Sequence, residues 1–441
     1  MRAKKTLLAI LLTASTLLGG CQQNKITPDV MPKKIRFATF NISFDRNSYS
    51  TLVKEMSTPS EQQGARFQQP RNIAEILQRV RPDVVLLNEF NNDGSGKDMR
   101  AINGFRANYL AVSQNGAEPV SYPYAYNFAT NTGKQIKGMD LNKDGKINEG
   151  PDDALGFGRY HGQYAFAVLS RYPLDESNLR TFRHFKWKDI RPQNPVITDK
   201  ESCQRILGRA RTYCEKRVGK PWYSDFEWNN IPMSAKNHAD LPIQFPNGQT
   251  IHFLISHPTP SMADNPVQHN TLHNLDEVKF WADYISDSTQ NRYIYDDNRQ
   301  RGGLSPEADF VIAGDLNADP VAGDGKKDAI KRLLNHKRIN PQVTGNHSPV
   351  SRGAVEYVSQ GVDCRETSYP ERITHIGNLH LDYVLPSSSL KVTATGVFWP
   401  DDTEKYGYLV KKPYCRHPEN KNCYGKEVSS DHRLVWVDIA L

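Results

Sequence analysis

Several polar side chains stand at the ends of apolar runs typical of β-strands, where α/β folds commonly assemble their sites. Asn41 comes near the end of KIRFATFNISF, Glu89 comes near the end of DVVLLNEF, and His257 ends TIHFLISH. Asparagine is a common turn former, and a lone histidine is often a hydrogen-bonded loop residue. A carboxylate at the end of a buried strand is costly without a cation or a donor, so Glu89 indicates a site most directly.

The second half of the chain continues this series of polar residues. Asp315 and Asn317 lie in ADFVIAGDLNADP, Asp382 lies in HLDYVLP, and Asp431 and His432 precede RLVWV. A turn or a cap could explain any one of them. An ordered series of Asn, Glu, His, Asp-x-Asn, Asp and Asp-His, each beside a strand, would rarely arise by chance. The series therefore predicts one catalytic site.

The spacing of the apolar residues predicts the elements that position this site. The run 34–44 alternates like a strand, the run 70–82 has one apolar helical face, and the run 83–90 is apolar like a buried strand. This order of strand, helix and strand indicates an α/β fold. Further strands are expected at 163–171, 250–257, 308–317, 380–386 and 432–441.

Two long inserts separate these elements, at about 90–160 and at about 180–245. They are rich in Asn, Gly, Pro and charged residues, so we interpret them as elaborated loops and not as separate domains. The chain from 35 to 441 is therefore expected to be one catalytic domain.

The motifs resemble those of the endonuclease/exonuclease/phosphatase superfamily, which includes DNase I, AP endonucleases and inositol-phosphate phosphatases. ATFNISF is similar to its first motif, LLNEF to its metal-binding glutamate motif, and ISHPTP to its active-site histidine motif. GDLNADP, LDYVLPS and SSDHRLVW are similar to its Asp-x-Asn, later aspartate and terminal Asp-His motifs. The resemblance implies a four-layer α/β sandwich, in which two packed mixed β-sheets are flanked by helices. ISHPTP and WADYI further resemble exported members described as phytase-like or alkaline-phosphatase-like.

The resemblance also implies a role for each polar residue. Glu89 and Asp431 would bind Mg²⁺, or else Mn²⁺ or Ca²⁺, and Asn41 would contribute to ion or phosphate binding. Asp315 would orient or deprotonate the attacking water, and Asn317 would hold the phosphate.

Two histidines and an aspartate would complete the chemistry. His432, aligned by Asp382, would stabilise the transition state or act as a base, and His257 would protonate the leaving oxygen. The roles of the two histidines are interchangeable on the sequence alone.

One segment resembles DNase I more specifically, with one departure. GRYHGQYAFAVLSR is similar to the stretch that supplies an active-site tyrosine, which falls here on Tyr160. DNase I-like members carry a glutamate nearby that supports a histidine, whereas this chain has Gly162. The adjacent His161 could compensate. The departure weakens a nuclease assignment more than the general one.

A second metal site is suggested by DLNKDGKIN, which is similar to an EF-hand loop. Asp140, Asn142, Asp144 and Asn148 occupy its first, third, fifth and ninth positions. The twelfth position is Pro151, where an EF-hand has a bidentate glutamate. A structural Ca²⁺ and a solvated turn therefore remain alternatives.

The N-terminus is similar to the export signal of a bacterial lipoprotein. Basic residues precede a short apolar stretch, which predicts a signal peptide at 1–20. The following LGGC resembles a lipobox, so Cys21 is the expected lipidation site at the start of a polar tether, 21–34. A plain secretory signal is the alternative. We expect an extracytoplasmic monomer at the bacterial cell envelope, in the outer membrane, held there by the lipid anchor only.

Charge and cysteine content refine this expectation. Removal of residues 1–20 takes away three basic residues, so the formal charge falls from +7 to +4. This excess permits anionic substrates but does not indicate nucleic acid by itself, and the densest basic cluster is RILGRARTYCEKRVGK in the second insert. The cysteine spacings suggest disulfides Cys203–Cys214 and Cys415–Cys423 with Cys364 unpaired, although the sequence does not fix the pairing.

The sequence therefore predicts a metal-dependent phosphoesterase that hydrolyses a small phosphomonoester or phosphodiester by water attack. A secreted DNase I-like endonuclease or exonuclease is the main alternative. The GRYHGQYAF segment favours the nuclease, and the weak net charge and the missing glutamate oppose it. A non-catalytic binding lipoprotein is a third alternative, which the complete set of polar positions opposes.

Overall fold

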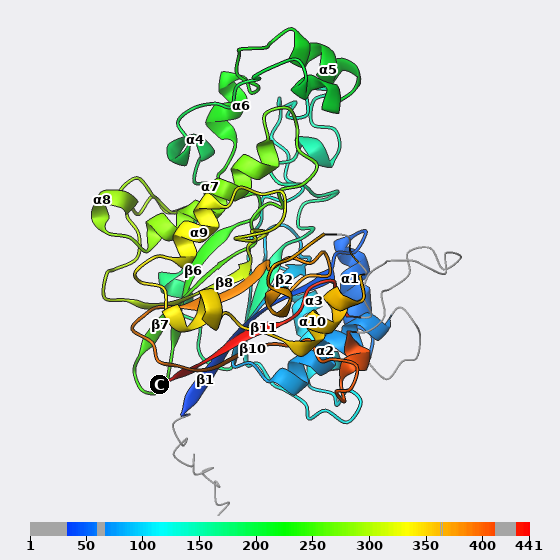
Figure 1. Cartoon of the computed structure of the whole chain (residues 1–441), viewed down its shortest axis with the longest axis vertical. Helices are drawn as coiled ribbons and strands as arrows, with labels where there is room; N and C mark the ends of the chain where they lie inside the picture. The colour runs from blue at the N-terminus through cyan, green and yellow to red at the C-terminus, as the bar shows by residue number, and fades with distance from the viewer. Residues whose placement is uncertain (1–32, 60–66, 362, 364, 411–428) are drawn as a thin grey trace, which may run out of the picture. The chain divides into compact units, whose positions relative to one another are not determined.

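Two mixed β-sheets form the centre of the fold (Figure 1). The six-stranded sheet has the order β10-β11-β1-β2-β4-β3, and the five-stranded sheet has the order β5-β6-β7-β8-β9. The computed structural model describes residues 33–59, 67–361, 363, 365–410 and 429–441. The strands are β1 (Lys34–Phe44), β2 (Val84–Phe90), β3 (Tyr124–Asn127), β4 (Phe166–Ser170), β5 (Arg180–Thr181), β6 (His238–Gln244), β7 (Thr250–Ser256), β8 (Asp309–Asp315), β9 (Asp382–Pro386), β10 (Val392–Val397) and β11 (Val435–Ala440).

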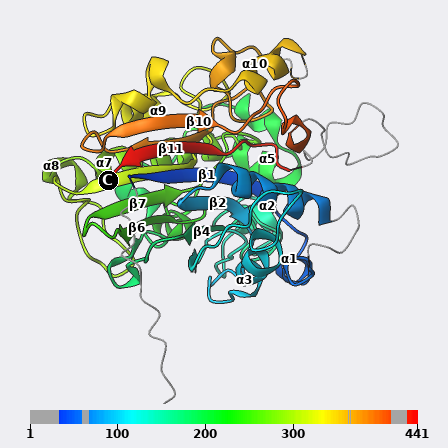
Figure 2. The ribbon, with the colours of Figure 1, turned by 90° about the horizontal axis from the view of Figure 1, so that it is seen from below.

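The two sheets pack face to face. β1 contacts β8 and β9, and β11 contacts β9, so the central strands of the six-stranded sheet lie on the β8–β9 side of the five-stranded sheet. Aromatic rings fill the space between them: the ring of Phe37 lies 5.5 Å from that of Phe253 and 6.1 Å from that of Phe245. Figure 2 shows β10, β11 and β1 side by side in the six-stranded sheet. Apolar burial between the sheets thus fixes the strands that carry the candidate site.

Helices cover the outer faces of both sheets and complete a four-layer α/β sandwich. On one side, Gln69 of α2 donates hydrogen bonds to the carbonyls of Ile42 and Ser43. On the other, Trp281 of α7 donates from Nε1 to Ser256 Oγ at 2.8 Å. The expected fold class is confirmed. The helices are α1 (Tyr49–Met56), α2 (Gln68–Val80), α3 (Arg100–Phe105), α4 (Trp187–Ile190), α5 (Gly208–Glu215), α6 (Asp225–Asn230), α7 (His269–Tyr284), α8 (Ser288–Asn291), α9 (Asp328–Leu334) and α10 (Arg352–Ser359).

The expected strands and the expected helix at 70–82 are all present, but the inserts contain more regular structure than predicted. β3, β5 and β6 lie inside them, and β10 was also not expected. β6 escaped prediction because Asp240 and Pro242 interrupt its apolar alternation. In the sheet, the Asp240 carboxylate accepts hydrogen bonds from the hydroxyl of Tyr284 and from Nδ1 of His252, both at 2.6 Å, which makes its burial tolerable.

The two inserts pack against each other around a second, smaller apolar core. Met139 and Leu155 of the first insert lie in it with Trp187 and Trp222 of the second. The disulfide Cys203–Cys214 is buried in the same core, which confirms that pairing. Cys364, Cys415 and Cys423 lie outside the described residues. None of the helices in the described part of the chain is long and apolar enough to span a membrane.

Candidate active site

Strand register brings the predicted residues to one edge of the sandwich. β1 and β2 are parallel, so Asn41 and Glu89 reach the same end of the six-stranded sheet. β7 and β8 are parallel as well, so His257 and Asp315 meet at the end of the five-stranded sheet. Asp382 is the register partner of Asp315 on the antiparallel strand β9.

Asp315 lies at the centre of the site, where donors surround its carboxylate. Its Oδ2 accepts a hydrogen bond from Asn41 Nδ2 at 3.1 Å and lies 3.3 Å from His257 Nε2 and 3.6 Å from His432 Nε2. Its Oδ1 accepts a hydrogen bond from the backbone N–H of Asn317 at 3.0 Å. Burial alone would raise the pKa of Asp315, but His432 and His257 hold it well below its usual range. Asp315 is therefore an ionised and weak base.

His432 connects two buried carboxylates. Its Nδ1 lies 2.8 Å from Asp382 Oδ2, and its Nε2 faces Asp315. Thr374 Oγ donates to the same Asp382 oxygen at 2.7 Å, which fixes the carboxylate. Burial alone would lower the pKa of His432, but Asp382 and Asp315 outweigh it and raise it to about 10. His432 is thus an imidazolium at neutral pH, with both ring nitrogens as donors.

His257 has the opposite protonation state. Burial and the charge of Lys236 lower the pKa of His257 to about 4. At neutral pH the site therefore holds one neutral and one charged imidazole, on two sides of the same aspartate. This difference separates two residues whose roles the sequence left interchangeable.

Glu89 and Asp431 supply carboxylate oxygens on the side of the site next to Asn41 and Ser43. Burial raises the pKa of Glu89 to about 7, and the charges of Asp45 and Asp431 add to the rise. Asp431 keeps an ionised carboxylate, because His432 and His375 outweigh burial and lower its pKa to about 2. Negative charge that is buried and only partly compensated calls for a cation, and carboxylate oxygens are the ligands that Mg²⁺ and Ca²⁺ prefer.

Asn41 bridges the carboxylate group and the catalytic aspartate. Its Nδ2 donates to Glu89 Oε1 at 3.2 Å and to Asp315 Oδ2, while its Oδ1 accepts from the N–H of Ser43. Ser43 in turn donates from its hydroxyl to Asp431 Oδ1 at 2.6 Å. Asn41 thus orients two carboxylates with its amide nitrogen, and its contribution to ion binding stays a prediction. Ser43 was not predicted, although it lies two residues after Asn41 in the first motif.

Three residues of the site have a backbone conformation that is unusual for side chains with a Cβ. Ser43, Glu89 and Asn317 have φ angles of 49°, 59° and 49°. Such conformations cost free energy and persist only where surrounding contacts hold them, which is typical of functional sites. The side chain of Asn317 donates from Nδ2 to the carbonyl of Pro258 at 3.0 Å. Its expected contact with phosphate stays a prediction.

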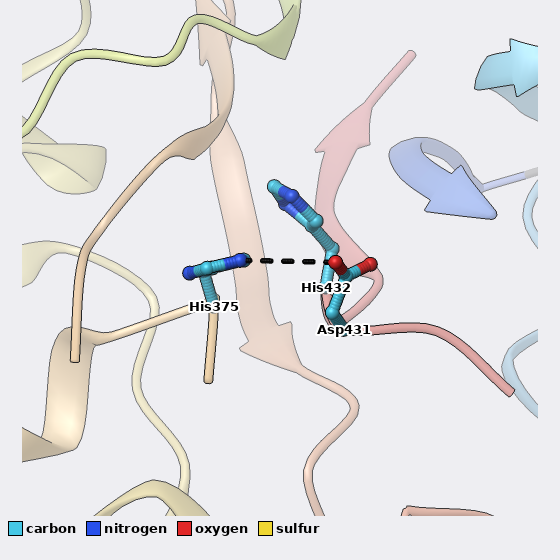
Figure 3. Close-up of side chains that lie close together, drawn as sticks. All are labelled: His375, Asp431 and His432. Carbon is cyan, nitrogen blue, oxygen red and sulfur yellow. Dashed lines mark ion pairs between the residues drawn. The ribbon is translucent and has the colours of Figure 1, made fainter. Parts of the chain in front are cut away.

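His375 is a further residue of the site that sequence patterns did not reveal. Figure 3 shows its ring directed toward Asp431 with His432 beside it: Nε2 lies 4.0 Å from Asp431 Oδ2, and the two histidine rings are 4.6 Å apart. His375 Nδ1 accepts a hydrogen bond from the N–H of Gly377 at 2.9 Å. A neutral imidazole whose Nδ1 accepts must carry its proton on Nε2. His375 therefore presents an N–H donor to the site, although its position beside Asp431 and His432 would also suit a metal ligand.

Lys236 is a second unpredicted residue, and it comes from the insert that was interpreted as a loop. It is almost fully buried at the start of β6. Burial lowers its pKa, while Glu277, Glu89 and Asp315 act in the opposite direction, so its amine lies in the field of the site. The Glu277 carboxylate accepts from the N–H groups of Ala235 at 2.9 Å and Thr259 at 2.6 Å. Helix α7 thereby fixes the segments that carry Lys236 and His257.

Tyr160 lies at the border of the site. Its hydroxyl donates to the carbonyl of Arg46 at 3.1 Å and contacts Asn91. A Cβ on Gly162 would lie 2.1 Å from the carbonyl oxygen of Asn92, so this backbone excludes a glutamate there. His161 points its Nε2 at the carbonyl of Thr130, 2.8 Å away, and thus does not replace that glutamate.

The EF-hand-like segment is a tight loop closed by its own backbone. Asp140 Oδ2 accepts from the N–H of Gly145, and Asn142 and Asp144 accept from N–H groups two residues ahead. Asn148 Oδ1 accepts from the N–H of Gly138. These bonds are typical of such loops, so the calcium ion stays a prediction.

A sequence profile described as the Endonuclease/Exonuclease/phosphatase family matches residues 38–432, from β1 to the terminal Asp-His pair. The chain belongs to the endonuclease/exonuclease/phosphatase family. Members of this family are hydrolases that act on phosphate esters. No sequence among curated proteins matches this chain.

Solved structures of the endonuclease/exonuclease/phosphatase family have a similar architecture at low identity. A protein of this family from Beutenbergia cavernae has 13% identity and a TM-score of 0.42, covering 93% of this chain and 72% of its own. The catalytic domain of human nocturnin, with bound sulfate, has 12% identity and a TM-score of 0.39, covering 93% and 95%. A Staphylococcus aureus beta toxin mutant with bound magnesium ions has 14% identity and a TM-score of 0.39, covering 92% and 99%.

The pairing of Asp382 with His432 generates a double-mutant prediction. Asp382→Asn should lower the raised pKa of His432, because it removes the nearest carboxylate. Asp382→Asn and His432→Gln should each reduce kcat/KM by about 10²- to 10⁴-fold, and the double variant should lose little more. Steady-state kinetics of the four proteins measure this. Losses that multiply in the double variant would show that the two residues act independently.

The tautomer of His375 generates a second prediction. Long-range ¹⁵N–¹H NMR spectra of the metal-free protein should show Nε2 protonated and Nδ1 unprotonated, since the N–H of Gly377 occupies Nδ1. Addition of Mg²⁺ should leave this pattern in place, and His375→Gln, which keeps an N–H donor, should retain more activity than His375→Ala. A proton on Nδ1 together with a metal-dependent shift of Nε2 would identify His375 as a metal ligand instead.

Proposed function

We propose that this protein is a metal-dependent phosphoesterase of the cell envelope that hydrolyses a small phosphate ester by water attack. The observation that carries the proposal is the position of Asp315, ionised between one neutral and one charged histidine and next to the carboxylates Glu89 and Asp431. Water activation, charge neutralisation and leaving-group protonation require these groups at close range.

The carboxylates of the site divide into two roles. Glu89 and Asp431 would hold the cation, which when bound neutralises charge on the phosphoryl oxygens. Asp315 would orient the attacking water by accepting its hydrogen bond. Its lowered pKa makes it a poor proton acceptor, which favours orientation over deprotonation.

The two histidines would have different roles. His432 is already protonated and held by Asp382, so it can stabilise the negative charge that develops in the transition state and can supply a proton. His257 is neutral, which makes it a hydrogen-bond donor to Asp315 and not a resident acid. We therefore assign the proton donor to His432, the reverse of the assignment first expected.

Contacts of the basic cluster in the second insert favour a small substrate over duplex DNA. Arg211 forms an ion pair with Glu215 at 2.9 Å on α5. Arg217 donates to the carbonyl of Pro221 at 3.0 Å and stacks on Tyr213. Side chains held within the insert are less available for the row of phosphate contacts that duplex binding requires. The phytase-like subgroup, which also implies a small ester, stays a prediction.

Metal dependence and substrate class can be tested on purified protein that lacks the tether. Phosphate release from a panel of small monoesters and diesters should require Mg²⁺ or Mn²⁺ and should stop in chelator. Glu89→Gln should bind the cation at least about tenfold more weakly and should recover partly at high Mg²⁺, because it loses a charged ligand. Glu118→Gln, which removes an exposed carboxylate from the first insert, is the matched control and should behave like the wild type.

The same preparations distinguish the nuclease alternative. Cleavage of plasmid DNA should be less efficient than hydrolysis of the preferred small ester at moderate salt. A strong preference for DNA that falls with rising salt and with neutralisation of Arg209 and Arg211 would identify a surface nuclease. Full hydrolytic activity in chelator would refute the metal site.

The proposed location depends on residues outside the described part of the chain. Cys21 and the signal peptide 1–20 lie there. Lipidation should appear as an acylated N-terminal cysteine in the intact mass of protein from the membrane fraction. Recovery of a soluble, unlipidated chain that begins at another residue would refute the anchor.

A further inference from the structure

Two cavities of similar size lie away from the candidate active site, and they differ in how their charges are balanced. The first, of about 390 Å³, is lined by Arg191, Lys279 and Arg332 among others. Each of these cations has a carboxylate partner: Arg191 lies 2.5 Å from Asp276, Arg332 lies 2.6 Å from Asp283, and Lys279 also pairs with Asp283. The charge of this cavity is satisfied within the protein.

The second cavity, of about 380 Å³, has the opposite character. Lys186, Lys188, Arg299 and Arg301 line it, together with Asn229, Tyr295 and a single acid, Asp189. Among the described residues, none of these four cations forms an ion pair with a carboxylate. The residues that line the cavity therefore carry a net positive charge, which no ion pair among the described residues neutralises.

The two lysines of this cavity donate to neutral oxygens, and Asp189, its single acid, accepts from a hydroxyl. Asp189 Oδ2 accepts from the hydroxyl of Tyr295 at 2.6 Å. Lys188 Nζ donates to Asn229 Oδ1 at 2.5 Å, and Lys186 Nζ donates to the carbonyl of Asn230 at 3.2 Å. Amide and carbonyl oxygens satisfy some N–H donors, but they leave the positive charge in place.

The backbone holds these cations in fixed positions. Lys186 forms a β-bridge with Pro232, and Tyr295 forms one with Arg301. Arg299 has a φ angle of 68°, and its guanidinium lies 4.9 Å from the centre of the Tyr295 ring.

Like charges in this cavity repel one another. Burial lowers the pKa of Lys186, and the charges of Arg299 and Lys188 lower it further, while Asp189 acts in the opposite direction. An anion bound in the cavity would offset the repulsion between these cations and would accept hydrogen bonds from their N–H groups.

We propose that the cavity lined by Lys186, Lys188, Arg299 and Arg301 is a binding site for a phosphate-type anion, separate from the catalytic carboxylates. Guanidinium groups match phosphate geometry through paired N–H donors, and lysine amines add charge. The volume is within the range of small-ligand pockets. The proposal goes beyond ester hydrolysis, because it assigns a second anion site to the chain.

The site is connected to the catalytic centre through the second insert and its neighbours. Pro232, the bridge partner of Lys186, lies four residues before Lys236. Asn131 of the first insert joins two neighbouring segments of the second, because it donates to the carbonyls of Arg183 and Ser234. Burial lowers the pKa of Lys134, and the charge of Arg183 lowers it further. Further positive charge therefore lies on this side of the insert. The same positive field would draw phosphate-containing molecules toward both sites.

Calorimetric titration of the protein with inorganic pyrophosphate in the presence of chelator tests the proposal. Chelator removes any cation from the catalytic carboxylates, and comparison of the cavity variants with the wild type assigns the binding to the cavity. The double variant Arg299→Gln/Arg301→Gln should bind pyrophosphate about tenfold more weakly or worse. Lys188→Gln should give a smaller loss of affinity in the same direction.

An exposed pair elsewhere provides the matched control. Arg292→Gln/Lys326→Gln removes the same charge from surface positions and should bind like the wild type. Absence of pyrophosphate binding by the wild type, or equal losses in both double variants, would overturn the proposal. Because no substrate is present, the outcome is independent of the phosphoesterase assay.

Vesicles distinguish a free anion from a lipid headgroup. Sedimentation with phosphatidylcholine vesicles that contain phosphatidic acid is compared with sedimentation with phosphatidylcholine alone. If the Arg299→Gln/Arg301→Gln variant loses vesicle binding as well as pyrophosphate binding, the site takes a phosphorylated headgroup. If it loses only pyrophosphate binding, the site takes a soluble phosphate. Both results support an anion site, and retention of both kinds of binding contradicts it.

Discussion

Burial of several carboxylates in one small volume is the constraint on which the rest of the structure depends. Asp382 and Asp315 lie opposite each other on neighbouring strands, and Glu89 and Asp431 lie close by. Ionised groups lose much of their hydration when buried, and like charges repel, so buried carboxylates take up protons or destabilise the fold unless donors and cations are fixed nearby. His432 compensates two of these charges at once, and Asn41, Ser43 and the backbone supply neutral donors. Even so, the raised pKa of Glu89 shows that the compensation is incomplete on the side where a cation fits.

The sandwich supplies the rigidity that this arrangement needs. Strands from two sheets end at the same edge, and aromatic packing between the sheets keeps those ends from separating. Loops alone would pay a large entropic cost to hold so many charged side chains within hydrogen-bond distance. Helix α7 adds further support, because its Glu277 carboxylate accepts hydrogen bonds from the backbone near Lys236 and from the backbone near His257. Apolar packing between the sheets therefore fixes the positions of the polar atoms in the site.

The sequence predicted the parts of the site that lie on regular strands. Glu89, Asp315 and Asp382 stand at strand ends, where alternation and flanking apolar runs make a polar residue conspicuous. Lys236 was missed because Pro242 and Asp240 interrupt the apolar pattern of the strand that follows it. The donors to the Asp240 carboxylate become visible only in three dimensions. His375 was missed because it follows no apolar run and reaches the site through a backbone bridge to His432. The protonation states of the histidines were also out of reach, since they depend on distances between residues that are far apart in sequence.

The two inserts form a lobe with an apolar core of its own, in addition to the core between the sheets. Trp187, Trp222 and the Cys203–Cys214 disulfide stabilise this lobe through contacts that the catalytic carboxylates do not share. The lobe nevertheless shares helix α7 with the site, because Trp187 donates from Nε1 to Asp276 Oδ2 at 2.7 Å and the next residue, Glu277, fixes the backbone beside Lys236 and His257. Substitutions with common partners change stability non-additively, so changes in the lobe and changes at the site are coupled through α7.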